Sequence, residues 1–341
     1  MKNKEKVLII GGSGFIGHNL GIRLSKKYKV YVADSFTINN LKSFNSNKNS
    51  LENRFYIKIL KERINLLKKN RINIIKIDAR NYKKMSKLVD KVNPNYIYHL
   101  AAVAHANVSN KNPFSTFDNS LRTLENSLDA TRSLKNLKRF FYLSSSMLYG
   151  QFKNSSVNEE TICEPLGIYG ALKFAGEKMV IGYNQVFNLP YTIIRPSALY
   201  GERCVSRRVI QIFIESALKK EPIQISGDGK EKLDFTYIED LINGMVSMMT
   251  KNKAKNQIFN LTFGNSRSLI ELISILKKYF PNLKIKKIPR DKLMPIRGTL
   301  SMNKAKKVLN FKSKFNLEKG IYKMMKWYLK KDNEKYFTRK T

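Results

Sequence analysis

A short apolar run that leads straight into a loop of spaced glycines constrains this chain more than any other feature. The run covers residues 7–10, the glycines are Gly11, Gly14 and Gly17, and a helical stretch follows from Ile16. A strand, a tight turn and a helix in direct succession are typical of the first unit of a parallel α/β sheet. Glycines in such a turn let backbone N–H groups approach a diphosphate at the helix N-terminus. The loop therefore predicts a dinucleotide site.

A second predicted strand, residues 30–33, ends in an acidic residue. Asp34 lies 17 residues beyond Gly17, near the distance at which a carboxylate binds the ribose of a dinucleotide. A carboxylate there accepts hydrogen bonds from the 2′-hydroxyl and repels a 2′-phosphate, and the neighbouring Ser35 and Phe36 are not basic. The pattern favours NAD over NADP. The predicted cofactor-binding residues of this unit are Gly11, Gly14, Phe15, Ile16, Gly17 and Asp34.

Alternating short apolar runs and longer helical stretches fill the first 200 residues, whereas Pro and Gly break the rest into shorter pieces. We therefore predict an α/β fold: a doubly wound parallel (Rossmann) sheet with a smaller mixed α/β C-terminal substrate domain. The predicted strands are residues 7–10, 30–33, 72–77, 96–100, 140–143 and 191–194. The predicted helices are residues 16–27, 51–69, 81–92, 114–137 and 169–186. Residues 34–50 are predicted to form a polar loop.

Three side chains suited to proton transfer follow the fifth predicted strand. Tyr169 and Lys173 are four residues apart and share one face of a helix that begins near Gly167. An ammonium beside a phenol favours the phenolate, which can exchange a proton with a substrate hydroxyl. Ser145 lies just after residues 140–143, at the strand ends where ligands of doubly wound sheets bind. We predict Ser145, Tyr169 and Lys173 as catalytic residues.

Charge and composition limit the partners. The chain carries 64 Lys and Arg against 26 Asp and Glu, a net charge of +38, but the lysines are spread along its whole length. This favours a solvated surface that steers an anionic small substrate over a nucleic-acid site. No apolar run reaches 18 residues, so no membrane span is expected. Two cysteines, Cys163 and Cys204, make neither a disulfide framework nor a metal site, and we expect a reduced, cytoplasmic, metal-free protein. His18, on the first helix, is expected to be exposed.

These motifs occur in the order found in extended short-chain dehydrogenases/reductases. More closely, the chain resembles the NAD-dependent nucleotide-sugar epimerase/dehydratase family, and its motifs are most similar to those of the 4-epimerases. The resemblance covers nearly all of residues 6–330. The segments that carry it are residues 11–17, Asp34, 78–80, 99–102, 144–150, Tyr169 with Lys173, 195–196, 227–229, 234–240, 297–298 and 303–320.

The resemblance implies further contacts. Asp78 and Ala79 would lie against the adenine, Lys173 would also touch the nicotinamide ribose, and Ser145 would hydrogen-bond the reacting sugar hydroxyl. Arg297 falls where family members hold the nucleotide diphosphate, which suits a guanidinium. The cofactor contacts implied beyond the glycine loop and Asp34 are Asp78, Ala79, Leu100, Ala101, Ala102, Tyr169 and Lys173. The substrate contacts are His105, Ser145, Ser146, Arg203 and Arg297.

The chain departs from the family pattern at four positions. Dehydratases of the family carry Asp and Glu where this chain has Ser146 and Met147, and decarboxylases carry Glu at the second position. Neither elimination nor decarboxylation is therefore expected. Ala198 and Leu233 stand where the family often has Asn and Arg, and both changes affect nucleotide and phosphate recognition. The sequence leaves open which of Lys230, Lys232, Arg203 and Arg207 compensates for the missing charge.

The sequence thus predicts an NAD-dependent 4-epimerase of a nucleotide sugar, with a UDP-hexose favoured, in a setting such as polysaccharide biosynthesis. A 4-keto nucleotide-sugar reductase is the alternative enzyme, and a non-catalytic dinucleotide-binding protein is the alternative from another class. By the resemblance, residues 1–196 with about 234–263 form the NAD domain, and residues 197–233 and 264–330 bind the nucleotide sugar. Residues 331–341 are predicted to be a frayed tail. The resemblance also implies a homodimer that packs the helices at residues 114–137 and 169–186.

Overall fold

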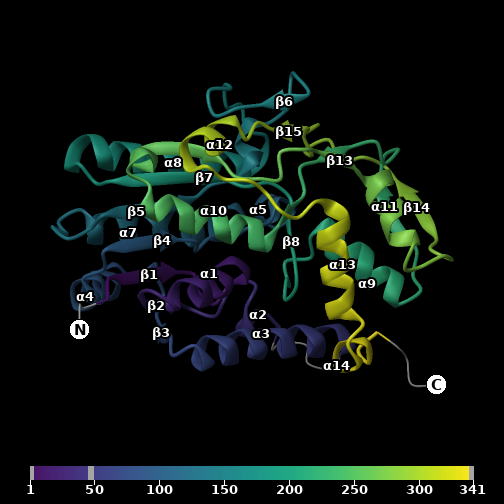
Figure 1. The fold of residues 1–341 in the computed structure, drawn as a ribbon, viewed down its shortest axis with the longest axis horizontal. Coiled ribbons are helices and arrows are strands. Elements are labelled where there is room, and N and C mark those ends of the chain that lie inside the picture. The colour runs from purple at the N-terminus through teal and green to yellow at the C-terminus, as the bar shows by residue number, and fades with distance from the viewer. Residues whose placement is uncertain (1–3, 45–49, 338–341) are drawn as a thin grey trace.

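The computed structural model describes residues 4–44 and 50–337. Seven parallel strands form the central sheet in the order β12-β7-β5-β4-β1-β2-β3, which confirms the predicted doubly wound α/β fold (Figure 1). The strands are β1 (Lys6–Ile10), β2 (Lys29–Asp34), β3 (Asn73–Lys76), β4 (Tyr96–His99), β5 (Arg139–Leu143), β7 (Tyr191–Arg195) and β12 (Gln257–Asn260).

The strand order reverses beside β1, because β2 pairs with one of its edges and β4 with the other. A crevice opens at the carboxyl ends of the strands at such a point. Apolar residues of β1 alternate between the two faces: Val7 and Ile9 pack into one core, and Leu8 and Ile10 into the other. Both faces are covered, as expected of a parallel sheet with continuous apolar strands.

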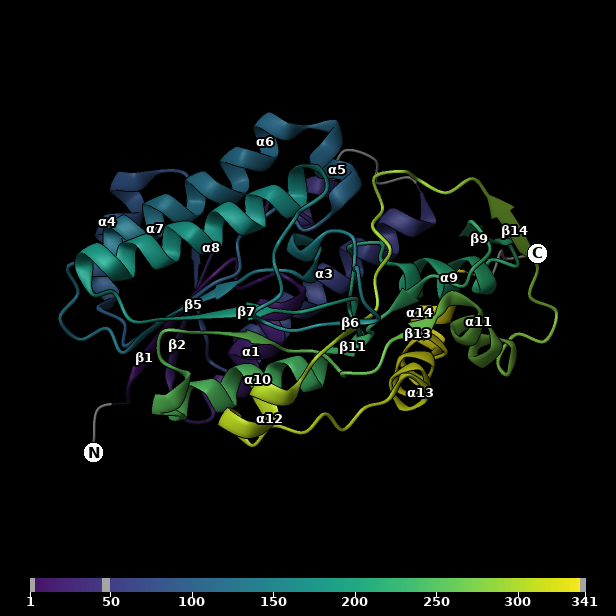
Figure 2. The same ribbon diagram turned by 90° about the horizontal axis from the view of Figure 1, so that it is seen from above.

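Helices cover both faces of the sheet (Figure 2). One layer contains α1 (Phe15–Ser25), α3 (Leu51–Lys69) and α10 (Ile238–Thr250), and the other contains α4 (Tyr82–Val92), α7 (Thr123–Thr131) and α8 (Gly167–Phe187). Shorter helices on the loops of this half are α2 (Leu41–Phe44), α5 (Ala106–Lys111), α6 (Pro113–Phe117), η2 (Asp118–Arg122), η3 (Ser146–Tyr149) and η4 (Asn252–Ala254). No helix of the described residues is long and apolar enough to cross a membrane.

The rest of the chain is built from short pieces. Its helices are α9 (Val209–Leu218), α11 (Leu269–Lys277), α12 (Asn303–Leu309), α13 (Leu317–Tyr328) and α14 (Lys331–Glu334). Two-stranded sheets pair β8 (Leu199–Tyr200) with β11 (Thr236–Tyr237), β9 (Ile223–Ser226) with β14 (Ile285–Ile288), β10 (Lys232–Leu233) with β13 (Arg267–Ser268), and β6 (Ser156–Val157) with β15 (Thr299–Leu300).

Asp234 joins three of these pieces. Its carboxylate is fully buried and accepts hydrogen bonds from the Thr262 hydroxyl and from the backbone N–H groups of Gly264 and Leu300. Burial raises the pKa of Asp234 to about 6, against the opposing effect of these donors. One carboxylate therefore connects the turn before β11 with β15 and with the loop that follows β12.

Four local predictions were wrong. The predicted tail contains α14, and Phe337 is buried with its ring 4.9 Å from that of Phe55; residues 338–341 lie outside the described part. The predicted polar loop, residues 34–50, contains the short helix α2. Residues 45–49 of that loop lie outside the described part of the chain. The helix expected over residues 114–137 is divided into α6, the π-turn η2 and α7, which ends at Thr131. His18 is fully buried, and its Nδ1 bonds to the carbonyl oxygen of Gly14, four residues earlier, over 2.9 Å.

Candidate active site

A cavity of about 680 Å³ lies at the carboxyl ends of the strands, between the sheet and the smaller half of the molecule. It brings together every predicted site residue except Arg203: Gly11, Gly14, Phe15, Ile16, Gly17, Asp34, Asp78, Ala79, Leu100, Ala101, Ala102, His105, Ser145, Ser146, Tyr169, Lys173 and Arg297. We call the side formed by the strand ends and the glycine loop the strand wall. The α9 wall is formed by residues 206–210, 212 and 213, and by Gln224, Ser226, Glu231, Leu233 and Arg297.

Close backbone packing explains the glycines of the strand wall. Gly11 has a left-handed φ of 79°, and a Cβ there would lie 2.7 Å from the backbone N of Ala101. A Cβ on Gly17 would lie 2.5 Å from the Cα of Gly12. Helix α1 then begins with Gly14 as its N-cap, with no capping side chain and no acidic residue in its first turn. Its free N–H groups and positive dipole end suit a diphosphate.

Asp34 is fixed at the end of β2 by two backbone donors. Its Oδ2 accepts from the N–H of Ser13 over 3.0 Å, and its Oδ1 accepts from that of Phe36 over 2.7 Å. Asn40 adds a bond to the Ser13 hydroxyl over 2.7 Å. The carboxylate is thus held against the glycine loop, where a ribose would be recognised.

The far end of the strand wall is more open. Asp78 accepts a bidentate pair of hydrogen bonds from Arg80, and this pairing lowers the pKa of Asp78. Both side chains are about two-fifths exposed, at 41% and 39%. The neighbouring Ala79 is fixed differently, because its carbonyl accepts from Asn126 over 2.9 Å inside the core. A free α1 terminus, a carboxylate beside the glycine loop and this rim together fit a dinucleotide.

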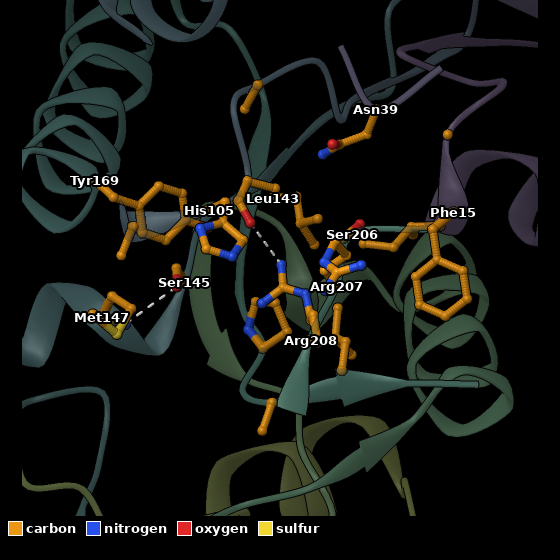
Figure 3. Close-up of a pocket in the computed structure, with 18 of the residues that line it drawn as sticks. Phe15, Asn39, His105, Leu143, Ser145, Met147, Tyr169, Ser206, Arg207 and Arg208 are labelled. Carbon is orange, nitrogen blue, oxygen red and sulfur yellow. Dashed lines mark hydrogen bonds between the residues drawn. The ribbon is translucent and has the colours of Figure 1, made fainter. Parts of the chain in front are cut away.

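Ser145 and Tyr169 line one end of the cavity (Figure 3). The Ser145 hydroxyl oxygen accepts from the N–H of Met147 over 3.2 Å and caps η3, so its own proton is left to donate. Figure 3 shows Tyr169, His105 and Ser145 on the same side of the cavity, with Phe15 at the opposite side. A bound substrate could therefore meet the phenol and the hydroxyl together.

Lys173 lines the cavity and is buried. Its side chain is 6% exposed, and its Nζ donates to the carbonyl oxygen of Leu143 over 2.6 Å. Burial lowers the pKa of Lys173 to about 8; Glu177 opposes this shift and the charge of Arg208 adds to it. The ammonium is thus placed at the strand end with little solvent around it, where its charge acts strongly on neighbouring groups.

A buried ion pair connects α8 with β7. Arg195 donates to both carboxylate oxygens of Glu177, over 2.9 and 2.7 Å, and the two side chains are 4% and 1% exposed. Arg195 also bonds to the hydroxyl of Tyr149, which in turn donates to Asn260. This network ties the helix that carries Tyr169 to the sheet.

The α9 wall is less completely bonded. Arg297 faces Glu231 at 3.7 Å, which is an ion pair but not a hydrogen bond, and its buried Nε has no partner. Facing this wall, on the side of Tyr169 and Ser145, His105 also has an unpartnered Nδ1, and burial, with the charge of Arg208, lowers its pKa. Polar groups that are buried without partners are uncommon and point to a bound ligand.

Arg203 is the substrate contact that the structure does not support. Its guanidinium pairs with Glu62 of α3 over 2.8 Å, and Arg203 does not line the cavity. The sequence prediction instead missed Arg208, which does line it, together with Gln224 and Ser226 of β9. An Arg-Arg pair in a basic chain gave no signal, because 64 Lys and Arg residues are spread over the sequence.

Residues 7–262 match the NAD dependent epimerase/dehydratase family. An uncharacterised UDP-glucose epimerase of Bacillus subtilis is 29% identical, over 93% of this chain and 95% of that protein. UDP-glucuronate 4-epimerase 1 of Arabidopsis thaliana is 27% identical, over 95% of this chain and 76% of that protein. The crystal structure of UDP-glucuronic acid 4-epimerase from Bacillus cereus, with UDP-glucuronic acid and NAD, superposes with a TM-score of 0.85. That structure is 27% identical and covers 94% of this chain and 98% of its own.

Proposed function

The chain belongs to the NAD-dependent epimerase/dehydratase family, and on that premise we propose that it is an NAD-dependent 4-epimerase of a UDP-sugar. One observation carries the proposal: the cavity joins a dinucleotide-type strand wall to Ser145, Tyr169 and Lys173. The positions after Ser145 hold Ser146 and Met147, which cannot act as a carboxylate acid or base. Proton transfer to and from a hydroxyl is therefore favoured over elimination. The relatives named above act on, or bind, UDP-sugars, which supports that class of substrate.

The residues of the chain divide the work. NAD, when bound, supplies hydride acceptance and return at C4 of the sugar. Tyr169, as phenolate, takes the proton of the C4 hydroxyl and later returns it, and the Ser145 hydroxyl donates a hydrogen bond to the same oxygen. Lys173 stabilises the phenolate with its ammonium. Between the two proton transfers the 4-keto sugar turns over and presents its other face.

The same proposal assigns the domains. Residues 1–196 and about 234–263 form the NAD-binding unit, and residues 197–233 and 264–330 the nucleotide-sugar unit. The position of β12 beside β7, and of α10 beside α1, supports the assignment of the returning segment to the first unit.

Cofactor content and sugar turnover test the function directly. The purified protein should release NAD on denaturation and should interconvert the C4 epimers of UDP-glucose or UDP-glucuronic acid, followed by NMR, without added cofactor. Absorbance of NADH should rise transiently with substrate. A requirement for stoichiometric reduced cofactor would identify a 4-keto sugar reductase instead. Protein without NAD, inert toward a panel of UDP-, dTDP-, GDP- and CDP-sugars, would contradict the proposal.

We also propose a homodimer through the helices at residues 114–137 and 169–186, that is, through α6, η2 and α7 together with α8, which lie side by side in Figure 2. Large apolar side chains are exposed on these helices, including Phe114 at 82% and Val186 at 70%. Large apolar side chains left exposed on neighbouring helices are a feature of protein interfaces. Sedimentation should give a dimer at micromolar concentration, and Phe114→Glu should shift it toward monomer. A monomeric wild-type protein would contradict this proposal.

A further inference from the structure

The family resemblance leaves the diphosphate of the nucleotide sugar short of one cation, because Leu233 stands where the family often has Arg. Leu233 lines the cavity in the structure, so the position is correct but apolar. A UDP-sugar brings two negative charges into this space, and charge-assisted hydrogen bonds are the usual means of holding them. A replacement cation is therefore expected elsewhere on the cavity lining.

Four basic residues near this region do not qualify. Lys230 and Lys232 are exposed and do not line the cavity. Arg203 is paired with Glu62 of α3, outside the cavity. Arg207 lines the cavity, but its half-exposed guanidinium is held by Glu52, a carboxylate that it shares with Lys219.

Arg208 differs from all four. It lines the cavity, and its Nη2 donates to the carbonyl oxygen of Ala104 over 2.9 Å, across the cavity from α9 (Figure 3). No acidic side chain of the described residues forms an ion pair with it. An uncharged carbonyl satisfies one of its five N–H donors and leaves the charge unbalanced.

The surroundings of Arg208 are also positive. Its charge lowers the pKa of Lys173, of His105 and of Arg297, each in addition to the effect of burial. Arg208 therefore lies near enough to Lys173, His105 and Arg297 for its charge to act on all three. Cations held this close repel one another unless an anion lies between them.

The start of α9 adds to this field. Arg208 is the N-cap of a ten-residue helix that has no capping side chain and no acidic residue in its first turn. Val209 and Ile210, the first two residues of the helix, also line the cavity. Their backbone N–H groups are among those that a helix leaves without internal partners, and they favour an anion.

We infer that Arg208, together with the first turn of α9 and Arg297, binds the diphosphate of the nucleotide sugar. Arg208 thereby supplies the positive charge that an arginine at position 233 would supply in the family. This inference rests on the proposed function, since it assumes a nucleoside-diphosphate ligand. It assigns Arg208, a cation of the α9 wall without an acidic partner among the described residues, to substrate binding. The sugar then extends toward Tyr169.

The NAD-containing protein can be titrated by calorimetry with UDP and, separately, with uridine. The difference between the two affinities gives the contribution of the diphosphate to binding. Arg208→Gln should weaken UDP binding about 10–100-fold, the effect of losing charge-assisted hydrogen bonds, and should change uridine binding less than about twofold. Arg208→Lys keeps the positive charge but not the paired N–H donors of the planar guanidinium, and it should give an intermediate loss of UDP affinity. Arg203→Gln is the matched control and should bind UDP like the wild type. Thermal unfolding and NAD content, measured on every variant, should stay unchanged.

Other outcomes of these titrations would contradict the inference, the proposed function or both. Unchanged UDP affinity in Arg208→Gln would overturn the inference even if the wild type is an active epimerase. Loss of NAD with UDP binding intact would assign Arg208 to the cofactor's diphosphate, and a loss confined to turnover of UDP-glucuronic acid would assign it to a sugar carboxylate; either would overturn the inference. A wild type that binds UDP through Arg208 but epimerises no sugar would contradict the proposed function alone. A wild type that binds no UDP would overturn both.

Discussion

The two walls of the cavity are built in opposite ways. On the strand wall, Asp34, Ser145 and Lys173 are each fixed by hydrogen bonds to the backbone at a strand end. On the α9 wall, Arg208 is bonded to a single carbonyl, and Arg297 has an unpartnered Nε and a loose contact with Glu231. One wall has its charges placed before any ligand arrives, whereas the other has charges that still lack partners.

This difference separates chemistry from recognition. Proton and hydride transfer require atoms positioned to a fraction of an ångström, which strand ends backed by a buried core provide. Recognition of a nucleotide sugar can vary between relatives, and loops and short helices tolerate that variation. Variants on the strand wall should therefore change the rate of reaction, and variants on the α9 wall should change ligand affinity.

Tyr169→Phe should have the largest effect on the strand wall. Phe keeps the ring and removes the hydroxyl that carries the proton, so turnover should fall about 10²–10⁴-fold while NAD stays bound. Single-turnover NMR with UDP-sugar and extraction of NAD from the same sample measure both quantities. Near wild-type turnover with NAD bound would remove Tyr169 from the mechanism and would break the division between the walls.

Glu177→Gln should have the largest effect on stability. The change leaves the buried Arg195 guanidinium without its carboxylate, and breaking a buried pair in this way costs about 3–5 kcal/mol. Urea unfolding measures the loss. Glu125→Gln is the matched control, because Glu125 pairs with Arg122 at the surface with both side chains 46% exposed, and this pair should contribute less than about 1 kcal/mol. Equal losses in the two variants would contradict the rigid support assigned to the strand wall.

Lys173→Met should change how the rate depends on pH. In the wild type, the ammonium loses its proton as the pH rises through about 8, so the rate should fall there. The variant should lack that fall and should be about 10–100-fold slower at pH 7. Initial rates from pH 6 to 10 test this. An unchanged profile in the variant would show that another group causes the fall.

The strand wall was largely predictable from sequence, because its chemistry depends on local spacing. A strand followed by glycines, an acid after the next strand, and Tyr and Lys four residues apart are all short patterns. All six strands predicted for the sheet are present, and no strand end is shifted by more than one residue. The seventh, β12, was not predicted as a strand, although residues 234–263 were assigned to the cofactor domain.

The α9 wall was not predictable in the same way. Its polar residues come from segments near positions 208, 224, 231 and 297, so no spacing connects them. Left-handed backbone at Arg203 and Arg207, with φ of 65° and 49°, breaks the regular alternation of side-chain directions just before Arg208. The sequence could therefore name Arg203 and Arg207 but could not show which arginine enters the cavity. The prediction of a frayed C-terminal tail was wrong for a similar reason, since Phe337 packs against Phe55, which is far away in the sequence.

Asp234→Asn tests the support of the α9 wall. Both carboxylate oxygens accept from donors, so an amide must turn its NH₂ toward an N–H or O–H group, at a cost of about 1–3 kcal/mol. The raised pKa adds a pH dependence: the folded state holds this proton more tightly, so the contribution of Asp234 to stability decreases as the pH rises from about 4 to about 6. The wild-type advantage over the variant in urea unfolding should thus be larger at pH 4.5 than at pH 7. An advantage that grows toward pH 7 would contradict the sign.

Arg80→Ala should have the smallest effect, although Arg80 makes a bidentate pair with Asp78 at the rim of the strand wall. Both side chains are about two-fifths exposed, and water and salt screen such a pair, so stability should fall by less than about 1 kcal/mol and less still at high salt. Arg80 lowers the pKa of Asp78, so this contribution is present near neutral pH and is lost as the pH falls through the lowered pKa. Thermal unfolding at low and high salt measures it, with Arg122→Ala as a control of similar exposure. NAD affinity should change less than about twofold, because rigid placement on the strand wall comes from buried partners and not from this exposed pair. A tenfold loss of NAD affinity would place Arg80 on the cofactor and extend the binding surface to the rim.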